Sequence, residues 1–270
     1  MADVTYTTAA GIWRRSGFVV IVSVLGTRIA VFPMDFLATC GDNTWGYVSF
    51  AVTCVIDIDP QHPGNIIDDQ NHPVDLEAAP VQGSFCYAET GKNSDVILSR
   101  GPEYFSREIA PSGIEESTRS ASSHATRSRP DQNAFREALI ARDSACLVTG
   151  LMAITSCDAA HIIPQSRPDM YEELQGHSND MFYCSSGMLL AKTLHHAYDA
   201  LKWSLYQKGD TYYVHFFNPE DITYRQVNGK AIPPSRFRFH EGPDPVLVAW
   251  HYRQTVRARI RGFSVGMKRH

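Results

Sequence analysis

The sequence predicts an α+β protein, and three observations support this fold class. Short β-branched runs separated by turn residues fill residues 18–98, which is typical of strands. A strand–loop–strand–helix order follows over residues 157–201, and an amphipathic helical pattern begins near Pro245. We therefore expect a sheet in the first part of the chain and a mixed α/β arrangement in the second.

The composition is that of an ordinary globular protein. Of 270 residues, 43% are hydrophobic and 20% are charged, and the net charge is −4. This charge does not indicate a nucleic-acid partner, so a local basic surface would have to supply the attraction. The six cysteines include no C-x-x-C pair, which argues against a zinc ribbon or a disulfide scaffold and favours buried, reduced thiols.

No segment near the N-terminus predicts membrane insertion or secretion. The apolar run from Phe18 to Leu25 is too short to span a bilayer. No convincing small-residue cleavage site follows it. We therefore expect an intracellular protein, cytoplasmic or nuclear, with no membrane partner.

The first 112 residues are expected to form a β-rich domain of unknown role. Turn residues at Gly26, Pro33 and Gly41 separate three runs that predict hairpins or a small sheet, namely FVVIVSVLG, TRIAVF and YVSFAVTCVIDI. Residues 62–80 are rich in Pro, Asp and Asn and predict a surface loop, and Cys86-Tyr87 predicts a further short strand. Nothing in this part has catalytic spacing.

Residues 113–132 predict a linker between two domains. This stretch is rich in Ser, Thr and Arg and has almost no apolar residue, so it can contribute little to a core. From Asn133 the apolar residues fall at helical spacing, which predicts a helix ending near Asp143. Residues 133–270 are then expected to form the second domain.

The residues with catalytic chemistry lie in this second domain. His161 ends a predicted strand in DAAHIIP, whereas His195 and Asp199 lie in LHHAYD, four residues apart on one face of a predicted helix. A neutral imidazole can serve as a base near neutral pH, and a cation with open coordination positions can neutralise developing charge. The elements predicted around them are strands at 146–148, 157–163 and 187–190, a long polar loop at 165–184 and a helix at 192–201.

This order of pieces resembles the HNH endonuclease family, whose ββα-metal finger has a strand ending in His and a helix bearing His. DAAHIIP, SGMLL and LHHAYD are similar to the family's A-A-H-I-x-P, N-G-L-L-L and H-x-x-F-D. The lead-in FREALIARDSACLVTG and the closing PPSRFRFH are similar as well. The resemblance covers roughly residues 133–263 and implies an HNH nuclease-like domain with flanking helices.

The resemblance also implies an activity and a set of site residues. It implies a metal-dependent endonuclease that hydrolyses phosphodiester bonds of nucleic acid, with DNA as the expected partner. His161 would be the general base, His195 would bind the metal, and Asp199 would share the metal or orient His195. Mg²⁺ is the usual cation of the family, and an imidazole–carboxylate site also accommodates Mn²⁺ or Zn²⁺.

Two positions depart from the family pattern. Ser186 occupies the place of the Asn that in the family pins the loop and the base, so we include Ser186 with His161 among the candidate catalytic residues. Ala160 stands where many members have a metal-ligating Asp or His, so another group must complete the metal site. Asp158 is the nearest carboxylate, but strand alternation predicts it on the face opposite His161.

The C-terminal helix is the candidate nucleic-acid surface. Arginines recur on it at four-residue steps, at Arg253, Arg257 and Arg261. Such a row can meet a phosphate backbone, or it can be a solvated face whose arginine stems pack on the protein. The predicted apolar stripe of the same helix comprises Ala249, Tyr252, Val256, Ile260 and Phe263.

Two other functions remain open from the sequence. The change at Ser186 and the modest charge are compatible with a non-catalytic module that keeps the finger as a scaffold. The finger can also serve another metal-assisted reaction on a small molecule. Resemblance at the level of the fold does not separate these functions. His196 lies about 100° around the helix from His195 and is expected to be a packing or surface residue.

Overall fold

The computed structural model describes residues 15–58, 63–91, 95–99, 129–176, 181–217, 227–237 and 242–260. Its contacts divide the chain into two compact units. The first unit comprises Met1–Pro102, Ala197–Pro233 and Val248–His270, and the second comprises Glu103–His196 and Pro234–Leu247. Both units contain strands and helices, so the predicted α+β class is confirmed.

The boundaries of the units differ from the expected division at residues 112 and 132. Two segments of the expected second domain group with the N-terminal part of the chain instead. Residues 113–128 of the expected linker lie outside the described residues. Helix α4 (Arg129–Asp143) takes in the last four linker positions, so these are helical.

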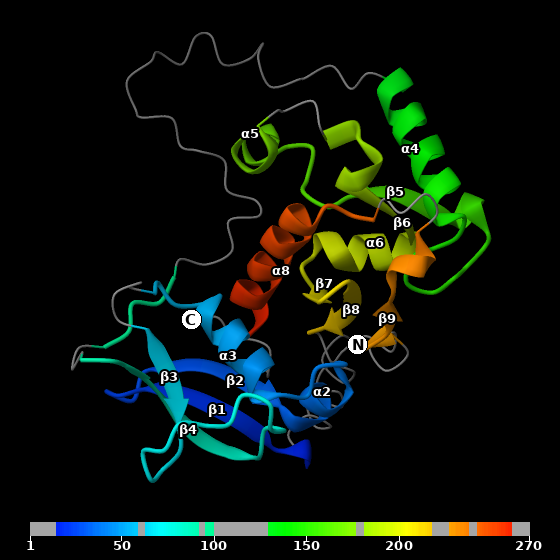
Figure 1. Cartoon of the computed structure of the whole chain (residues 1–270). Coiled ribbons are helices and arrows are strands. Elements are labelled where there is room, and N and C mark those ends of the chain that lie inside the picture. Colours follow the sequence, from blue (N-terminus) through cyan, green and yellow to red (C-terminus); the bar gives the residue numbers. More distant parts are fainter. Residues whose placement is uncertain are drawn as a thin grey trace, which may run out of the picture. The chain divides into compact units, whose positions relative to one another are not determined.

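A four-stranded sheet of order β2-β1-β4-β3 forms the N-terminal part of the first unit (Figure 1). β1 (Phe18–Ser23) pairs antiparallel with β2 (Arg28–Pro33) and parallel with β4 (Gly83–Glu89). The expected strands at these places are therefore confirmed. β3 (Gly64–Ile67) pairs antiparallel with β4 and lies inside the segment expected to be a loop, so that expectation is wrong there.

Two helices in this unit follow β2. α2 (Met34–Thr39) comes directly after it, and α3 (Trp45–Thr53) occupies the third run that was expected to be a strand. The Thr44 side chain caps α3 by accepting a hydrogen bond of 3.2 Å from the Tyr47 N–H. Because α3 is apolar almost all round, its sequence lacks the alternation between faces that would distinguish a helix from a strand.

The rest of the first unit combines a small sheet with most of the C-terminal helix. β7 (Trp203–Lys208) and β8 (Thr211–Phe216) form a hairpin, and β9 (Ala231–Ile232) pairs with β8. α8 (Pro245–Arg259) confirms the expected C-terminal helix. Its expected apolar stripe is partly wrong, because Tyr252, Val256 and Ile260 are buried but Ala249 is exposed; Phe263 lies outside the described residues.

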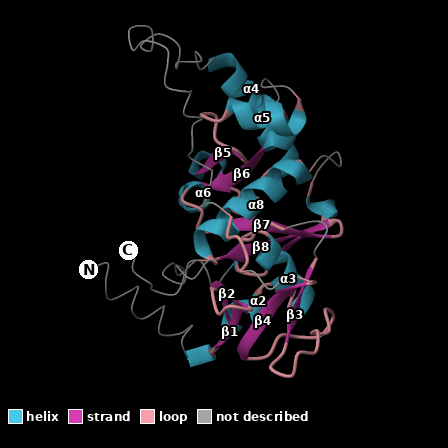
Figure 2. Cartoon of the chain, turned by 90° about the vertical axis from the view of Figure 1, so that its left-hand side faces the viewer, coloured by secondary structure: helices cyan, strands magenta, loops and turns pink. Residues whose placement is uncertain are grey.

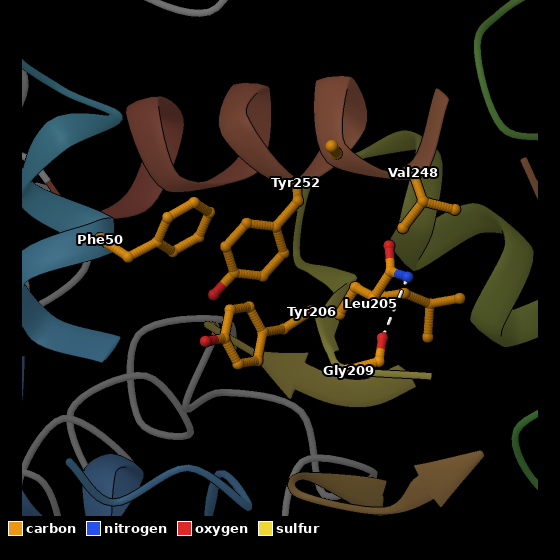
Figure 3. A pocket seen from close by; sticks show the side chains of 8 residues that line it. Phe50, Leu205, Tyr206, Gly209, Val248 and Tyr252 are labelled. Atoms are coloured by element: carbon orange, nitrogen blue, oxygen red, sulfur yellow. Dashed lines mark hydrogen bonds between the residues drawn. The ribbon is translucent and has the colours of Figure 1, made fainter. Parts of the chain in front are cut away.

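Figure 3 shows a pocket of about 280 Å³ in the first unit. Phe50, Tyr206 and Tyr252 supply its aromatic walls. The two tyrosine hydroxyls bond to other protein groups, Tyr206 to Asp42 at 2.9 Å and Tyr252 to His215 at 2.7 Å. None of the predicted site residues lines this pocket.

The second unit is built around a two-stranded hairpin (Figure 2). β5 (Cys157–His161) pairs antiparallel with β6 (Gly187–Ala191), and α6 (Lys192–Asp199) begins directly after β6. α4 contacts both strands, and its Arg136 donates hydrogen bonds to the carbonyls of Cys157 and Ile154. The expected strand–strand–helix order is therefore confirmed.

Two expected features of the second unit are wrong. Residues 146–148 form part of a turn, closed by a 2.8 Å bond from the Gly150 N–H to the Cys146 carbonyl. The expected loop at 165–184 contains α5 (Pro168–Gln175), which has Pro at its start and Gly176 at a φ of 87° after its end. Both are ordinary helix boundary signals. No described helix in either unit is long and apolar enough to cross a membrane.

Candidate active site

The hairpin of β5 and β6 places His161 at the end of a strand, as expected from DAAHIIP. In the register of the two strands His161 lies opposite Gly187. A Cβ atom at Gly187 would collide with the ring of Phe135 and with the carbonyl oxygen of Ala160. Glycine is therefore needed here because the Phe135 ring must pass close to the backbone to reach His161.

The main chain of Ser186 pins the residue that follows His161. The Ile162 N–H donates a 2.9 Å hydrogen bond to the Ser186 carbonyl, and Ser186 is completely buried. This bond is made by the backbone, so it is available to Ser and Asn alike. The replacement of Asn by Ser at this position therefore leaves at least one contact that holds the end of this strand.

Aromatic rings enclose the imidazole of His161. The Phe135 ring stacks on it with centroids 4.3 Å apart and an angle of 29°, and the Phe182 ring meets it edge-on at 5.9 Å. Burial first, and the neighbouring His195 second, lower the pKa of His161 to about 4, although an interaction with the Met181 backbone acts in the opposite direction. His161 is therefore a neutral imidazole at neutral pH.

A buried ion pair holds the helix α4 against this hairpin. Arg142 and Asp143 are 2% and 0% exposed, and the Arg142 Nε lies 2.6 Å from the Asp143 Oδ1. Arg142 also donates to the carbonyls of Cys184 and Gly187, and Asp143 accepts from the Leu189 N–H. The pair thus fixes both ends of the segment that leads into β6.

We did not anticipate this pair from the sequence. The sequence shows it only as an Arg–Asp dipeptide at the end of a predicted helix. At such a place at least one of two adjacent charged residues is expected to face solvent, so the dipeptide does not indicate a buried pair. Arg236, in the PPSRFRFH segment, adds a 2.8 Å bond to the Asp143 carbonyl. That contact gives the closing motif a structural role in this unit.

His195 lies beside a carboxylate from the neighbouring strand. Its Nδ1 is 3.5 Å from the Oδ2 of Asp158, and the two side chains are 26% and 39% exposed. Strand alternation predicts Asp158 on the face opposite His161, yet both residues lie within the electrostatic reach of His195. Because His161 is the last residue of β5, alternation no longer decides where its side chain points.

The remaining candidate metal residues are placed as follows. Asp199 is the last residue of α6 and falls in the first unit, so its predicted role beside His195 stays a prediction. His196 is exposed, as expected for a surface residue. Within the described ranges no group of three or more His, Cys, Asp and Glu side chains is close enough together to hold a metal ion.

The three predicted nucleic-acid-binding arginines differ in their surroundings. Arg253 is exposed on α8. Arg257 is half-buried, and its Nε donates a 3.0 Å hydrogen bond to the Cys54 carbonyl. Arg261 lies outside the described residues. Of these two described arginines, Arg253 is thus the more exposed to a partner in solution.

Comparison with known protein families identifies this region. Residues 146–206 match the HNH endonuclease family. This segment is an HNH domain. The match includes β5, β6 and α6, together with His161, Ser186, His195 and Asp199. No curated protein matches the chain.

An HNH domain suggests a nuclease-type function and a nucleic-acid substrate. HNH nucleases generally use a divalent metal ion, and the donors present in this domain suit one. His195 supplies an imidazole and Asp158 a carboxylate, 3.5 Å apart and both partly exposed to solvent. An imidazole whose other ring nitrogen faces a carboxylate is a common ligand of such ions.

Proposed function

We propose that this protein is a metal-dependent endonuclease that hydrolyses phosphodiester bonds of nucleic acid, with His161 as its general base. The observation that carries the proposal is the placement of His161, at the end of β5 inside the HNH match and within the electrostatic reach of a second imidazole that has a carboxylate partner. A neutral imidazole can take a proton from water at any pH above its pKa. A histidine that only packs in the core would need neither the second imidazole nor the carboxylate.

The reaction assigned to His161 is a hydrolysis in one displacement. The lone pair of Nε2 takes a proton from water as the water oxygen bonds to phosphorus. The bond from phosphorus to the leaving oxygen breaks, and that oxygen is protonated by solvent. His161 then returns its proton to solvent, which restores the neutral base. The aromatic rings of Phe135 and Phe182 keep the imidazole in one orientation through these steps.

His195 is the proposed metal ligand, with Mg²⁺ as the expected cation. A bound divalent ion supplies charge neutralisation for the phosphate and the leaving oxygen. Asp158 is placed to accept the Nδ1–H of His195, so that the other ring nitrogen faces the ion; a ligating histidine commonly has such a partner. Asp199 remains the second candidate carboxylate, on the strength of the sequence.

The substrate is proposed to be DNA, bound in part through Arg253. An exposed guanidinium on a helix can contact a phosphate, and each such contact contributes to salt-dependent affinity. Arg257 is a weaker candidate because its Nε already bonds within the protein. Arg261 stays a prediction. The site of action is proposed to be inside the cell.

A cleavage assay tests the proposal. Supercoiled plasmid, single-stranded DNA and RNA would each be incubated with the full chain in Mg²⁺ or Mn²⁺, with EDTA as the metal-free control. Loss of a general base is expected to slow cleavage by about 10²- to 10⁴-fold in His161→Ala. His196→Ala is the matched control, because it removes an exposed histidine from the neighbouring helix.

Two results would contradict the proposal. Equal cleavage by wild type and His161→Ala would remove His161 as the base. No cleavage of any substrate with any divalent ion would instead favour a non-catalytic HNH module. Cleavage by wild type that depends on the metal and on His161, but not on His196, is the expected result.

A further inference from the structure

In the unbound protein the reactive nitrogen of His161 is already engaged. The Nε2 of His161 lies 3.1 Å from the amide nitrogen of Gln165, and this contact needs a donor and an acceptor. An amide nitrogen can only donate a hydrogen bond, so Nε2 must be the acceptor. The proton therefore sits on Nδ1, Nε2 carries the lone pair, and the Gln165 amide donates to it.

This contact falls on the atom that a general base uses. A water that is to be deprotonated must lie within about 2.6–3.2 Å of the lone pair of Nε2. The amide nitrogen of Gln165 is at that distance now. A neutral imidazole has one lone pair in the ring plane, so the amide and the water cannot both occupy it.

The main chain around Gln165 is fixed, which leaves the side chain as the part that can move. Gln165 sits in a turn closed by a 2.9 Å bond from the Arg167 N–H to the Pro164 carbonyl. Before the turn, the Tyr171 hydroxyl donates to the Ile163 carbonyl at 2.7 Å. After it, Arg167 forms an ion pair with Asp169 at 2.7 Å.

Gln165 itself is only half-buried, and its side chain has three rotatable bonds. A rotamer change is fast compared with typical turnover and needs no movement of the backbone. The turn therefore presents the amide to His161 at rest and allows it to leave. A rigid backbone with one movable side chain is suited to covering and exposing a single ring nitrogen.

We propose that Gln165 closes the lone pair of His161 in the substrate-free protein, and that the attacking water binds only after the Gln165 amide has turned away. Gln165 is thus a positioning residue that competes with the nucleophile. This inference rests on the proposed function of His161 as a base. It adds a residue outside the HNH motif positions and predicts that removing the amide raises the rate.

Chemical modification tests the closure without relying on cleavage. Diethyl pyrocarbonate acylates the free lone pair of a neutral imidazole, and peptide mass spectrometry reports each histidine separately. Gln165→Met keeps the length of the side chain and removes the donor. Its His161 is expected to be acylated about 3- to 10-fold faster than in wild type, the factor that one hydrogen bond is worth.

An internal reference histidine and a control variant accompany this measurement. His72 has a side chain that is 71% exposed, and its acylation rate should be the same in both proteins. Gln207→Met is the matched control, because it removes an amide that bonds to the Gly209 carbonyl in the first unit. Gln165→Ala removes the bulk as well as the donor and should show at least the same increase as Gln165→Met.

Cleavage kinetics provide the second readout. If the water must displace the amide, kcat of Gln165→Met should rise by the same factor of about 3 to 10 with KM unchanged. An unchanged or slower acylation of His161 in Gln165→Met would overturn the closure, whatever the cleavage rate. Faster acylation with a lower kcat would overturn the competition with water, because the amide would then assist the reaction.

The failure of the two proposals can be told apart. Absence of cleavage in every protein, including wild type, would overturn the nuclease function. Acylation of His161 would still decide whether Gln165 closes the lone pair, because that reaction needs no substrate and no metal.

Discussion

His161 in the second unit and His215 in the first are both shielded strand histidines with a lowered pKa, yet their ring nitrogens differ. His215 is completely buried, and its pKa falls to about 3 because of that burial. Its Nε2–H donates to the Cys40 carbonyl at 2.9 Å, and its Nδ1 accepts from the Tyr252 hydroxyl at 2.7 Å. Both nitrogens of His215 are thus held by groups that cannot leave without opening the core.

The Nε2 of His161 is not held in this way. This nitrogen contacts the side chain of Gln165, which is half-buried and can rotate. The difference teaches that neither burial nor a low pKa identifies a catalytic base. What separates the two histidines is whether a lone pair can be exchanged between the protein and a water molecule.

The sharpest way to break this comparison is to replace each histidine by the same residue. His161→Phe keeps an aromatic ring to stack on Phe135, so its stability should change by less than about 1 kcal/mol, whereas cleavage should fall by about 10²- to 10⁴-fold. His215→Phe leaves the buried Cys40 carbonyl without this partner, at about 1–3 kcal/mol, and removes one of the two hydrogen bonds of the Tyr252 hydroxyl, which keeps its bond to Tyr47.

Urea unfolding separates the two effects. The three tryptophans that the structure describes, Trp45, Trp203 and Trp250, belong to the first unit, so their fluorescence reports the unfolding of that unit. We expect His215→Phe to lower the fluorescence midpoint and His161→Phe to leave it unchanged. If His161→Phe shifted this midpoint as much as His215→Phe, His161 would be a structural histidine and the distinction would fail.

The dependence of stability on pH provides the second, smaller effect. His215 and His251 in the first unit both have a pKa lowered by burial to about 3, against 6.5 when unfolded. As the pH falls below 6.5 the unfolded chain takes up protons that the folded unit does not. The stability gained from the neutral rings is therefore fully present above pH 6.5 and is lost progressively toward pH 3, by about 1.4 kcal/mol per pH unit for each histidine.

The measurement is the free energy of unfolding of the first unit between pH 7.5 and 5, followed by tryptophan fluorescence. Wild type should lose stability as the pH falls, and His215→Phe should lose it less steeply by one proton, about 1.4 kcal/mol per pH unit. The same slope in both proteins would show that His215 is not buried in its neutral form. Carboxylates affect both proteins equally and cancel in the difference.

The HNH segment of this fold was easier to predict from the sequence than the elements that support it. DAAHIIP, SGMLL and LHHAYD each carry local signals, so the strand ending in His161 and the helix bearing His195 were predicted correctly. Helix α3 was not, because a segment that is apolar almost all round shows no clear periodicity, although Thr44 was a readable cap. Contacts with distant parts of the chain, and not the local pattern, decided that this segment is a helix.

The contacts of the site residues were beyond the sequence for a related reason. Asp158 meets His195 across 37 positions, and Arg142 bonds to the carbonyl of Gly187 across 45. Nothing in the local pattern of either residue specifies a partner so far along the chain. The Gln165 contact spans only four positions, but it depends on the turn at residues 164–167, whose geometry the dipeptide Pro-Gln does not specify.

The third prediction concerns His195 and sharpens the comparison with His251. The Nδ1 of His251 lies 2.8 Å from the Ser204 hydroxyl inside the core, whereas the Nδ1 of His195 faces Asp158 and its side chain is 26% exposed. The binding of a metal ion should therefore depend on His195. If Asp158 orients His195, Asp158→Asn should weaken the binding of Mn²⁺ by about 10- to 100-fold.

Isothermal titration of the full chain with Mn²⁺ measures this effect, with His195→Ala as the reference for a lost site. Glu172→Gln is the matched control, because Glu172 is an exposed carboxylate of the same unit. Asp199→Asn tests the carboxylate predicted from the sequence. Loss of affinity in Asp199→Asn, with none in Asp158→Asn, would assign the metal to the carboxylate on α6 and make the 3.5 Å contact of Asp158 an incidental surface pair. Loss in Asp158→Asn would instead show that the strand ending in the base also orients the metal ligand.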